Sequence, residues 1–301
     1  MKQPLINWQE LQRLNRPPMA PPQQKEEGNM WDRAADMYKQ MAAMEKSYTV
    51  GFLDAFETRP TDTVLDVGCG PGRISVPMAQ RAKSVTSVDS AQRMLNHCIQ
   101  NAKDAGVTNL TPRLLDWETA ELGRDLEQHD IVIASRSVGL QNLRKLSSFA
   151  RRIAVIMAWA NAPSIPNILH DIFVGCSEEE ERRGPFPMDR RVGYNVTYNM
   201  VYDMGYDPNV RILTDGFTRD FSCREEAYAE MVSLGTVAPG KMDVYRANLD
   251  RFLTQNSDGS VTFRRETRSF VMVGDRSKQS VRIIISCFYQ KTAVLAAVFY
   301  V

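Results

Sequence analysis

Two aspartates and a run of glycines are spaced as they would be around a ligand with a sugar and a positive charge. Asp66 precedes a loop from Gly68 to Gly72, and Asp89 follows about twenty residues after it. An acid at that distance can accept hydrogen bonds from both hydroxyls of a ribose. A carboxylate two residues before the first glycine would repel a phosphate and attract a cation. The pattern therefore predicts a nucleoside that carries a positive group.

One strand, helix and strand unit within Thr63–Asp89 must position these residues. A short apolar run at 64–67 breaks at the glycines, a helix-like segment continues through Ala82, and a β-branched run at 85–88 closes the unit. This order is typical of a βαβ crossover in a mostly parallel sheet. Because ligands bind outside the carboxyl ends of such strands, the glycines and Asp89 are expected at one edge of the sheet.

The loop departs from the pattern that binds a dinucleotide. That pattern is G-x-G-x-x-G, in which backbone N–H groups meet a pyrophosphate. Here Arg73 stands in place of the third glycine, and Asp66 would oppose the phosphates. Both features weigh against a nicotinamide-dependent oxidoreductase, which stays open as an alternative.

The segment Asp66–Gly72 together with Asp89 resembles the first two motifs of the class I S-adenosylmethionine-dependent methyltransferases. Within that family, Ile133–Ser137 and Tyr194–Gly205 resemble a group of uncharacterised prokaryotic small-molecule methyltransferases. The likeness is clear over about residues 29 to 160 and thinner to about 276. It implies an α/β fold with a Rossmann-like, seven-stranded, mostly parallel sheet, helices on both faces and an antiparallel last strand. It also implies an N-terminal helical lid and a helical cap insertion.

The resemblance implies S-adenosyl-L-methionine as cofactor and direct in-line transfer of its methyl group to a small-molecule acceptor. It implies that Asp116 accepts a hydrogen bond from the adenine amino group and that Trp117 covers the ring. Asp116 has an alternative role as the N-cap of a short segment at 118–122. The candidate cofactor-binding residues are Asp66, Gly68, Cys69, Gly70, Gly72, Asp89, Ser90, Met94, Asp116, Trp117 and Ser135.

Candidate residues for the acceptor side come from several parts of the chain. Arg136 follows a buried-type strand at 131–134 and would either hold an acceptor carboxylate or pair with a helix carboxylate. The full set of candidates is Tyr38, Arg136, Trp159, Tyr194 and Tyr198. Plain packing is the alternative role for the tyrosines, because Tyr194 and Tyr198 share one helical face and Tyr38 lies beside a methionine stripe in a helix that begins at Asn29. No histidine is well placed as a general base, so catalytic residues stay unassigned and a non-catalytic cofactor-binding protein is a further alternative.

Composition limits the partners of the chain. Lys plus Arg number 37 and Asp plus Glu 36 among 301 residues, so no overall field would attract nucleic acid or an anionic membrane. Five scattered cysteines without a C-x-x-C pair favour a reducing compartment. Residues 1–10 lack the continuous apolar core of a signal peptide, so a cytoplasmic location is expected. Three histidines far apart in the sequence predict no metal site.

The expected organisation has three parts. Residues 1–60 form an N-terminal arm and helical lid, and residues 61–280 form a methyltransferase domain with a cap insertion at about 162–205. Residues 281–301 form an apolar tail of unknown role. A lysine at position 291 would be expensive inside a bilayer, so we expect no membrane span there. A pair of strands at a homodimer contact is the role that we consider for this tail.

Overall fold

The computed structural model describes residues 6–8, 10–11, 29–45, 48–160, 165–177 and 193–275. The strands are β1 (Thr63–Val67), β2 (Ser84–Asp89), β3 (Leu110–Leu114), β4 (His129–Ser135), β5 (Ala150–Trp159), β6 (Asn209–Phe221), β7 (Leu253–Gln255) and β8 (Val261–Asp275). The helices are α2 (Met30–Met44), α3 (Tyr48–Leu53), α4 (Ser75–Ala79), α5 (Gln92–Asp104), α6 (Leu143–Ser148), α7 (Ile165–Phe173), α9 (Tyr194–Asp203), α10 (Arg224–Met231) and α11 (Met242–Asp250).

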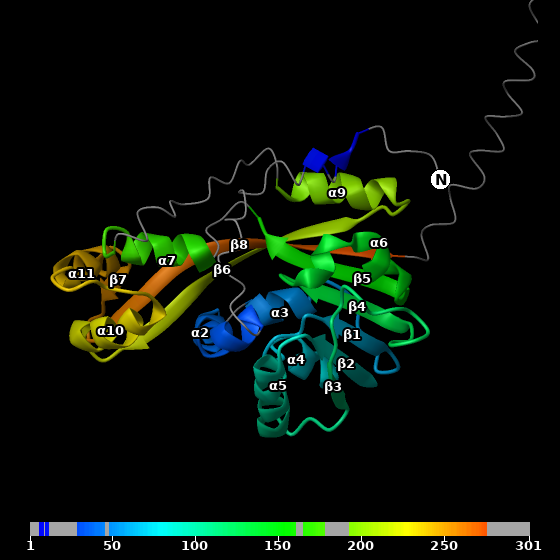
Figure 1. The fold of residues 1–301 in the computed structure, drawn as a ribbon, viewed down its shortest axis with the longest axis horizontal. Coiled ribbons are helices and arrows are strands. Elements are labelled where there is room, and N and C mark those ends of the chain that lie inside the picture. The colour runs from blue at the N-terminus through cyan, green and yellow to red at the C-terminus, as the bar shows by residue number, and fades with distance from the viewer. Residues whose placement is uncertain are drawn as a thin grey trace, which may run out of the picture.

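The strands form one sheet in the order β3-β2-β1-β4-β5-β8-β6 (Figure 1). The first five strands in this order are parallel, and β8 is antiparallel to both of its neighbours. The expected mostly parallel sheet with an antiparallel last strand is therefore confirmed. The short β7 pairs with β8 as an additional strand. The sequence predicts a helix over 242–253, whereas α11 ends at Asp250 and Leu253 begins β7.

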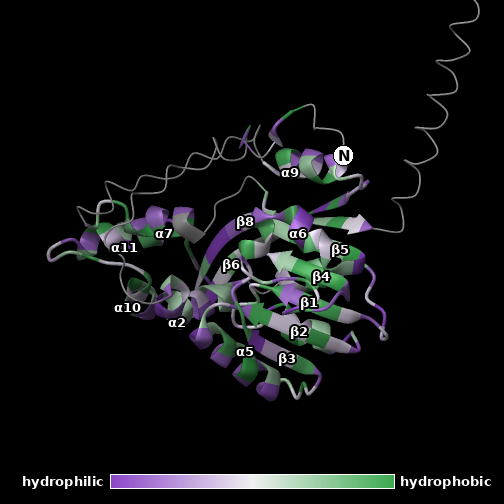
Figure 2. Ribbon diagram, turned by 45° about the vertical axis from the view of Figure 1, so that its right-hand side comes forward, coloured by the Kyte–Doolittle hydropathy of each residue, from purple (hydrophilic) through white to green (hydrophobic). Residues whose placement is uncertain are grey.

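Apolar residues face both sides of the central strands, as strands covered by helices on two faces require. Val64 and Ile131 pack with the residues of α3 and α4 on one face. Leu65 and Val132 pack with α6 and the end of α9 on the other. Figure 2 shows mostly hydrophobic residues in β4 and β5 and hydrophilic residues along the exposed sides of α2 and α5.

The antiparallel pair of β6 and β8 is much longer than the sequence predicts. Short apolar runs predict strands only at 210–213 and 269–273, whereas the two strands pair from Asn209 and Val273 out to Phe221 and Val261. Only the part of β8 from Ser269 onward pairs with β5, so the distal half projects from the sheet, with α7, α10, α11 and β7 around it (Figure 1). The alternation of charged and apolar residues in these distal halves concealed the strands from a search for continuous apolar runs.

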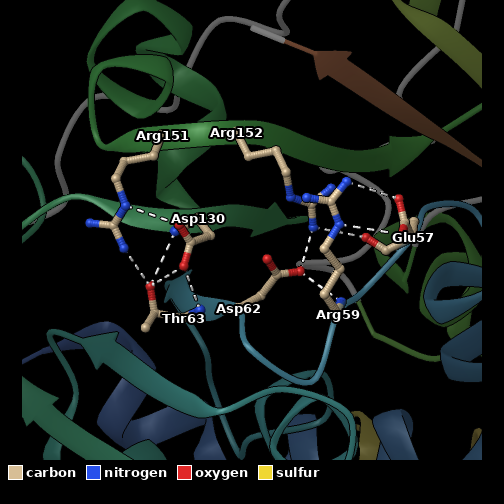
Figure 3. Close-up of polar contacts among 7 residues, drawn as sticks. All are labelled: Glu57, Arg59, Asp62, Thr63, Asp130, Arg151 and Arg152. Carbon is tan, nitrogen blue, oxygen red and sulfur yellow. Dashed lines mark hydrogen bonds and ion pairs between the residues drawn. The ribbon is translucent and has the colours of Figure 1, made fainter. Parts of the chain in front are cut away.

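A polar network ties together the amino ends of the parallel strands (Figure 3). The Asp130 carboxylate accepts hydrogen bonds from the Thr63 backbone N–H at 2.8 Å and from the Arg151 Nε–H at 2.9 Å. Arg152 forms an ion pair with Asp62 beside it. The Arg151 guanidinium is the main cause that holds the pKa of Asp130 well below its usual range. This edge of the sheet is stabilised by internal charge pairs, which leaves the opposite, carboxyl edge for a ligand.

Some predictions fall outside the residues that the structure describes. These concern most of the N-terminal arm, residues 161–164 and 178–192 of the cap insertion, and the tail at 281–301. Where the chain is described, no helix is long and apolar enough to cross a membrane.

Candidate functional site

A cavity of about 430 Å³ opens at the carboxyl ends of β1, β2, β3 and β4. This volume lies within the range of about 300 to 1,000 Å³ that is usual for sites of drug-sized ligands. The cavity brings together ten of the eleven candidate cofactor-binding residues; the exception is Gly72, which packs against Cys98 instead. Residues predicted from separate strands therefore share one space.

The glycine loop gives a ligand close access to the backbone. Gly68 has a φ of +67°, and a Cβ there would lie 2.6 Å from the Cβ of Ser137, so a side chain has no room. Gly70 has a φ of +54°, and a Cβ there would meet only the Tyr38 ring, at 3.7 Å. The space beside Gly70 is therefore open toward the cavity, which suits a ligand lying against the main chain.

Two aspartates lie at the ends of β1 and β2. Asp66 is 2% exposed and accepts a hydrogen bond from Ser75 Oγ at 2.6 Å. Burial raises the pKa of Asp66 to about 6. The Asp89 carboxylate accepts hydrogen bonds from the backbone N–H of Gly70 and of Ala91, both at 2.9 Å, while its burial raises its pKa. Each carboxylate oxygen has two lone pairs, so Asp89 keeps acceptor capacity toward the cavity.

Asp116 and Trp117 line the cavity beyond the end of β3. Asp116 Oδ1 accepts a hydrogen bond from the Glu118 N–H at 2.9 Å, which is the capping role that we considered as an alternative. Trp117 is only 3% exposed, and its ring packs 5.0 Å from that of Phe149. The indole therefore belongs to the core of the sheet and presents only part of its surface to a ligand.

Arg136 lies past the end of β4 in a strained left-handed conformation, with a φ of +51°. Its Nη1 donates to both carboxylate oxygens of Glu45 at 2.8 and 2.9 Å. Arg73 Nη1 donates to the same carboxylate at 2.6 Å. Of the two roles considered for Arg136, the pairing with a helix carboxylate is therefore present, since Glu45 directly follows α2. A carboxylate buried between two guanidinium groups is a strong, fixed ion pair.

Tyr48 lies between the two arginines. The Arg73 guanidinium is 3.6 Å from the centre of the Tyr48 ring, and that of Arg136 is 4.6 Å from it. The Tyr48 hydroxyl is hydrogen-bonded to Ser135 Oγ, and both residues line the cavity. Sequence reasoning missed Tyr48 and Glu45 because their partners come from segments 28 to 91 residues away along the chain.

Helix α2 forms one side of the cavity with Trp31 and Tyr38. Asn29 caps the helix, as predicted, by accepting a hydrogen bond from the Trp31 N–H at 2.9 Å. The two rings meet edge to face, with centroids 5.8 Å apart, and burial raises the pKa of Tyr38. The position of Tyr38 fits its proposed place beside a ligand.

The remaining acceptor-side candidates lie outside the cavity lining. Trp159 stacks on the Arg136 guanidinium at 3.3 Å and reaches the site only through it. Tyr194 and Tyr198 pack against the core on α9, where Tyr194 meets Phe270 at 5.8 Å. Neither α7 nor α9 supplies a described lining residue, so the structure gives no support to a substrate role for the cap insertion.

No metal-binding group is present in the part of the chain that the structure describes, where no three His, Cys, Asp or Glu side chains gather suitably.

Residues 64–158 match the family model described as "Methyltransferase domain". This segment is a methyltransferase domain. The match covers less than half of the chain, and it includes the glycine loop, the three aspartates and Arg136. The resemblance to the class I methyltransferases is thus confirmed for residues 64–158, which supply most of the cavity lining.

Relatives of the methyltransferase domain include proteins with and without a known activity. An uncharacterized protein from Haemophilus influenzae is 33% identical over 114 residues, which are 38% of this chain and 42% of that protein. A 23S rRNA (uracil(1939)-C(5))-methyltransferase from Methylococcus capsulatus is 33% identical over 98 residues, which are 31% of this chain and 22% of that protein. The chain thus spans less than half the length of these relatives.

Among solved structures, a SAM-dependent methyltransferase from Thiobacillus denitrificans in complex with S-adenosyl-L-homocysteine is 11% identical to this chain. The match has a TM-score of 0.48 and covers 83% of this chain and all of that one.

Proposed function

We propose that the methyltransferase domain transfers a methyl group from S-adenosylmethionine to a small-molecule acceptor. The observation that supports this is the meeting of Asp66, Asp89 and Asp116 beside an open glycine loop in one cavity. These three carboxylates fit a nucleoside with a positive group, because they can accept hydrogen bonds from ribose and amine donors and attract a cation. The cofactor, when bound, supplies a methyl group on a sulfonium that is already a good leaving group.

The chain itself would bind and orient the cofactor and the acceptor, and it would exclude water from them. Asp89 would hold the ribose hydroxyls, Asp116 would accept from the adenine edge, and Asp66 would face the cationic part. Holding the acceptor in line with the methyl carbon can supply a large part of the rate acceleration, because proximity and orientation by themselves lower the barrier. A general base is required only when the acceptor atom carries a proton that must leave.

Calorimetric titration with S-adenosylhomocysteine tests the proposal. The wild-type protein should bind it, and Asp89→Ala should weaken binding by about tenfold or more, because hydrogen bonds to a charged group contribute roughly 1.5 to 3 kcal/mol each. Asp125→Asn, which removes an acid outside the cavity, is the matched control and should bind like the wild type. Absence of heat at about a hundred micromolar, roughly a 5 kcal/mol limit on binding, would end the proposal.

The acceptor class needs a separate experiment, because some relatives are named as rRNA methyltransferases. We favour a small molecule since the chain has a net charge of only +1. Transfer of radiolabel from the cofactor to a metabolite extract, compared with transfer to total RNA, separates the two classes. The alternatives of nicotinamide chemistry and of binding without turnover predict no transfer to either. A cytoplasmic location and a homodimer stay predictions.

A further inference from the structure

The cavity has charges of opposite sign at its two ends. Asp66, Asp89 and Asp116 lie at the tips of β1, β2 and β3, whereas Arg136 lies past the tip of β4. Arg73 joins Arg136 at that end, because both contact the same glutamate. The sheet order places β4 beyond β1, on the side of β5 and β8. An adenosine at the acidic end would thus leave the arginine end for the second reactant.

The Arg136 guanidinium is fixed in place by contacts on several sides. It stacks between the rings of Tyr48 and Trp159, and Nη2 donates to Ser269 Oγ at 2.6 Å. Its side chain is only 8% exposed. An arginine held in this way loses little conformational entropy when it binds a planar oxyanion.

The arginine cluster, which we define as Arg73, Arg136 and Glu45, has an excess of positive charge. One buried carboxylate serves two guanidinium groups, and the Glu45 side chain has no exposed surface. Among the described residues, Nε of Arg136 is buried and has no hydrogen-bond partner. Because two guanidinium groups share one carboxylate at the cavity wall, the net charge there is positive and attracts an anionic ligand.

We propose that the methyl acceptor is an anion whose carboxylate or phosphate binds the arginine cluster beside Ser135. The inference rests on the proposed function, since it assigns the second reactant of that same cavity. An oxyanion here would compete with Glu45 for the guanidinium groups of Arg136 and Arg73 and neutralise the net positive charge of the cluster. The acceptor would then be anchored at the end of the cavity remote from the three aspartates. The carboxylate of the cofactor is another source of the same chemistry, which the test must separate.

The test measures oxyanion binding to the protein with its cofactor site already filled. Protein saturated with S-adenosylhomocysteine is titrated with benzoate and with inorganic phosphate, at constant ionic strength, and followed by calorimetry. Saturable binding of one of these probes is expected. The same titrations are repeated with 5′-methylthioadenosine, which lacks the amino-acid part, in place of S-adenosylhomocysteine.

Two substitutions in the arginine cluster should act in opposite directions. Arg136→Gln should weaken binding of the probe by about tenfold or more, as loss of a charge-assisted contact does. Glu45→Gln should tighten it, because the internal carboxylate no longer competes for the arginines. Arg265→Gln is the matched control: this arginine pairs with Asp171, its Nε likewise has no described partner, and it lies outside the cavity lining. Glu45→Gln keeps the test decisive if Arg136→Gln does not fold.

Three results would overturn the inference. The first is that no probe binds to protein that does bind S-adenosylhomocysteine. The second is that Glu45→Gln weakens or leaves unchanged the binding of the probe. The third is binding with 5′-methylthioadenosine only, which would assign the arginines to the cofactor's carboxylate. Failure of S-adenosylhomocysteine itself to bind would be a failure of the proposed function, and it is seen before any probe is added.

Discussion

Asp66 shows how a binding residue can destabilise the fold that presents it. The carboxyl is buried beneath the glycine loop, where the neutral form has a lower free energy of burial than the ionised form. Its pKa of about 6 means that it is mostly ionised at pH 7 despite this environment. Ser75 Oγ is its nearest stabilising donor, and a cationic ligand would favour the ionised form further.

Asp66→Asn should therefore make the free protein more stable at neutral pH while weakening cofactor binding. The folded-state pKa of about 6 exceeds the unfolded value of 3.8, so the folded state holds more protons between these values. Stability due to this group thus falls as the pH rises from about 4 to about 6, by up to about 3 kcal/mol in total. Urea unfolding should show a gain for Asp66→Asn that is largest at pH 7.5 and shrinks toward pH 4.

Asp130→Asn is the matched comparison for that experiment. The pKa of Asp130 is held low by Arg151, so ionised Asp130 stabilises the fold above the unfolded pKa and loses that contribution as the pH falls. Its replacement should lower stability at pH 7.5, opposite in sign to Asp66→Asn. If the Asp66→Asn variant is no more stable than the wild type at pH 7.5, our account of the buried acid is wrong.

At the scale of elements, α2 acts as a wall of the cavity and is fastened to α5. Asp32 Oδ1 accepts from the Arg93 N–H at 2.8 Å, and the Arg93 side chain pairs with Asp36 at 2.5 Å. Asn29 Nδ2 donates to the Ser90 carbonyl at 2.8 Å. These contacts are mostly exposed, so they hold the helix in place without contributing much to global stability.

Arg93→Ala should loosen α2 more than it destabilises the protein. We expect faster amide hydrogen exchange over residues 30–38 and weaker binding of S-adenosylhomocysteine, with a change in unfolding free energy of less than about 1 kcal/mol. Arg124→Ala, which removes an exposed ion pair with Asp125 away from the cavity, should leave exchange in α2 unchanged. Unchanged exchange over residues 30–38 in Arg93→Ala would show that other packing holds the helix.

The accuracy of the sequence predictions follows the range of the interactions that determine each element. The unit from Thr63 to Asp89 was predicted because its strands, glycine break and helix depend on neighbours in sequence. The distal parts of β6 and β8 were missed because their strand conformation depends on pairing with a segment some forty residues away, as in the pair Phe221 and Val261. The three aspartates were found because strand ends are readable, whereas Glu45 follows a helix whose contacts the sequence does not reveal.

At the scale of the whole molecule, the chain has a second core outside the parallel sheet. It surrounds the distal halves of the paired strands β6 and β8. It includes Phe173, whose ring centroid lies 5.4 Å from that of the stacked Tyr245 ring. Met41 and Met44 of α2 also belong to it, so the helix that walls the cavity is anchored partly in this second core. The parallel sheet and the projecting parts of β6 and β8 therefore pack around separate cores, and they share α2 and the two long strands.

Phe173→Ala should destabilise the second core without abolishing cofactor binding. Removing a fully buried phenylalanine costs about 3 to 5 kcal/mol, and here the loss falls on the packing around α7 and α11. Because that core is distinct from the one beneath the methyltransferase domain, calorimetric scans should show a separate transition at lower temperature. Phe149→Ala, equally buried but in the core of the sheet, should instead lower the main transition. Identical single transitions in both variants would contradict this prediction. They would mean that the sheet and the projecting parts of β6 and β8 unfold as one cooperative unit. A change at α7 would then affect the cavity by lowering global stability and not by moving α2.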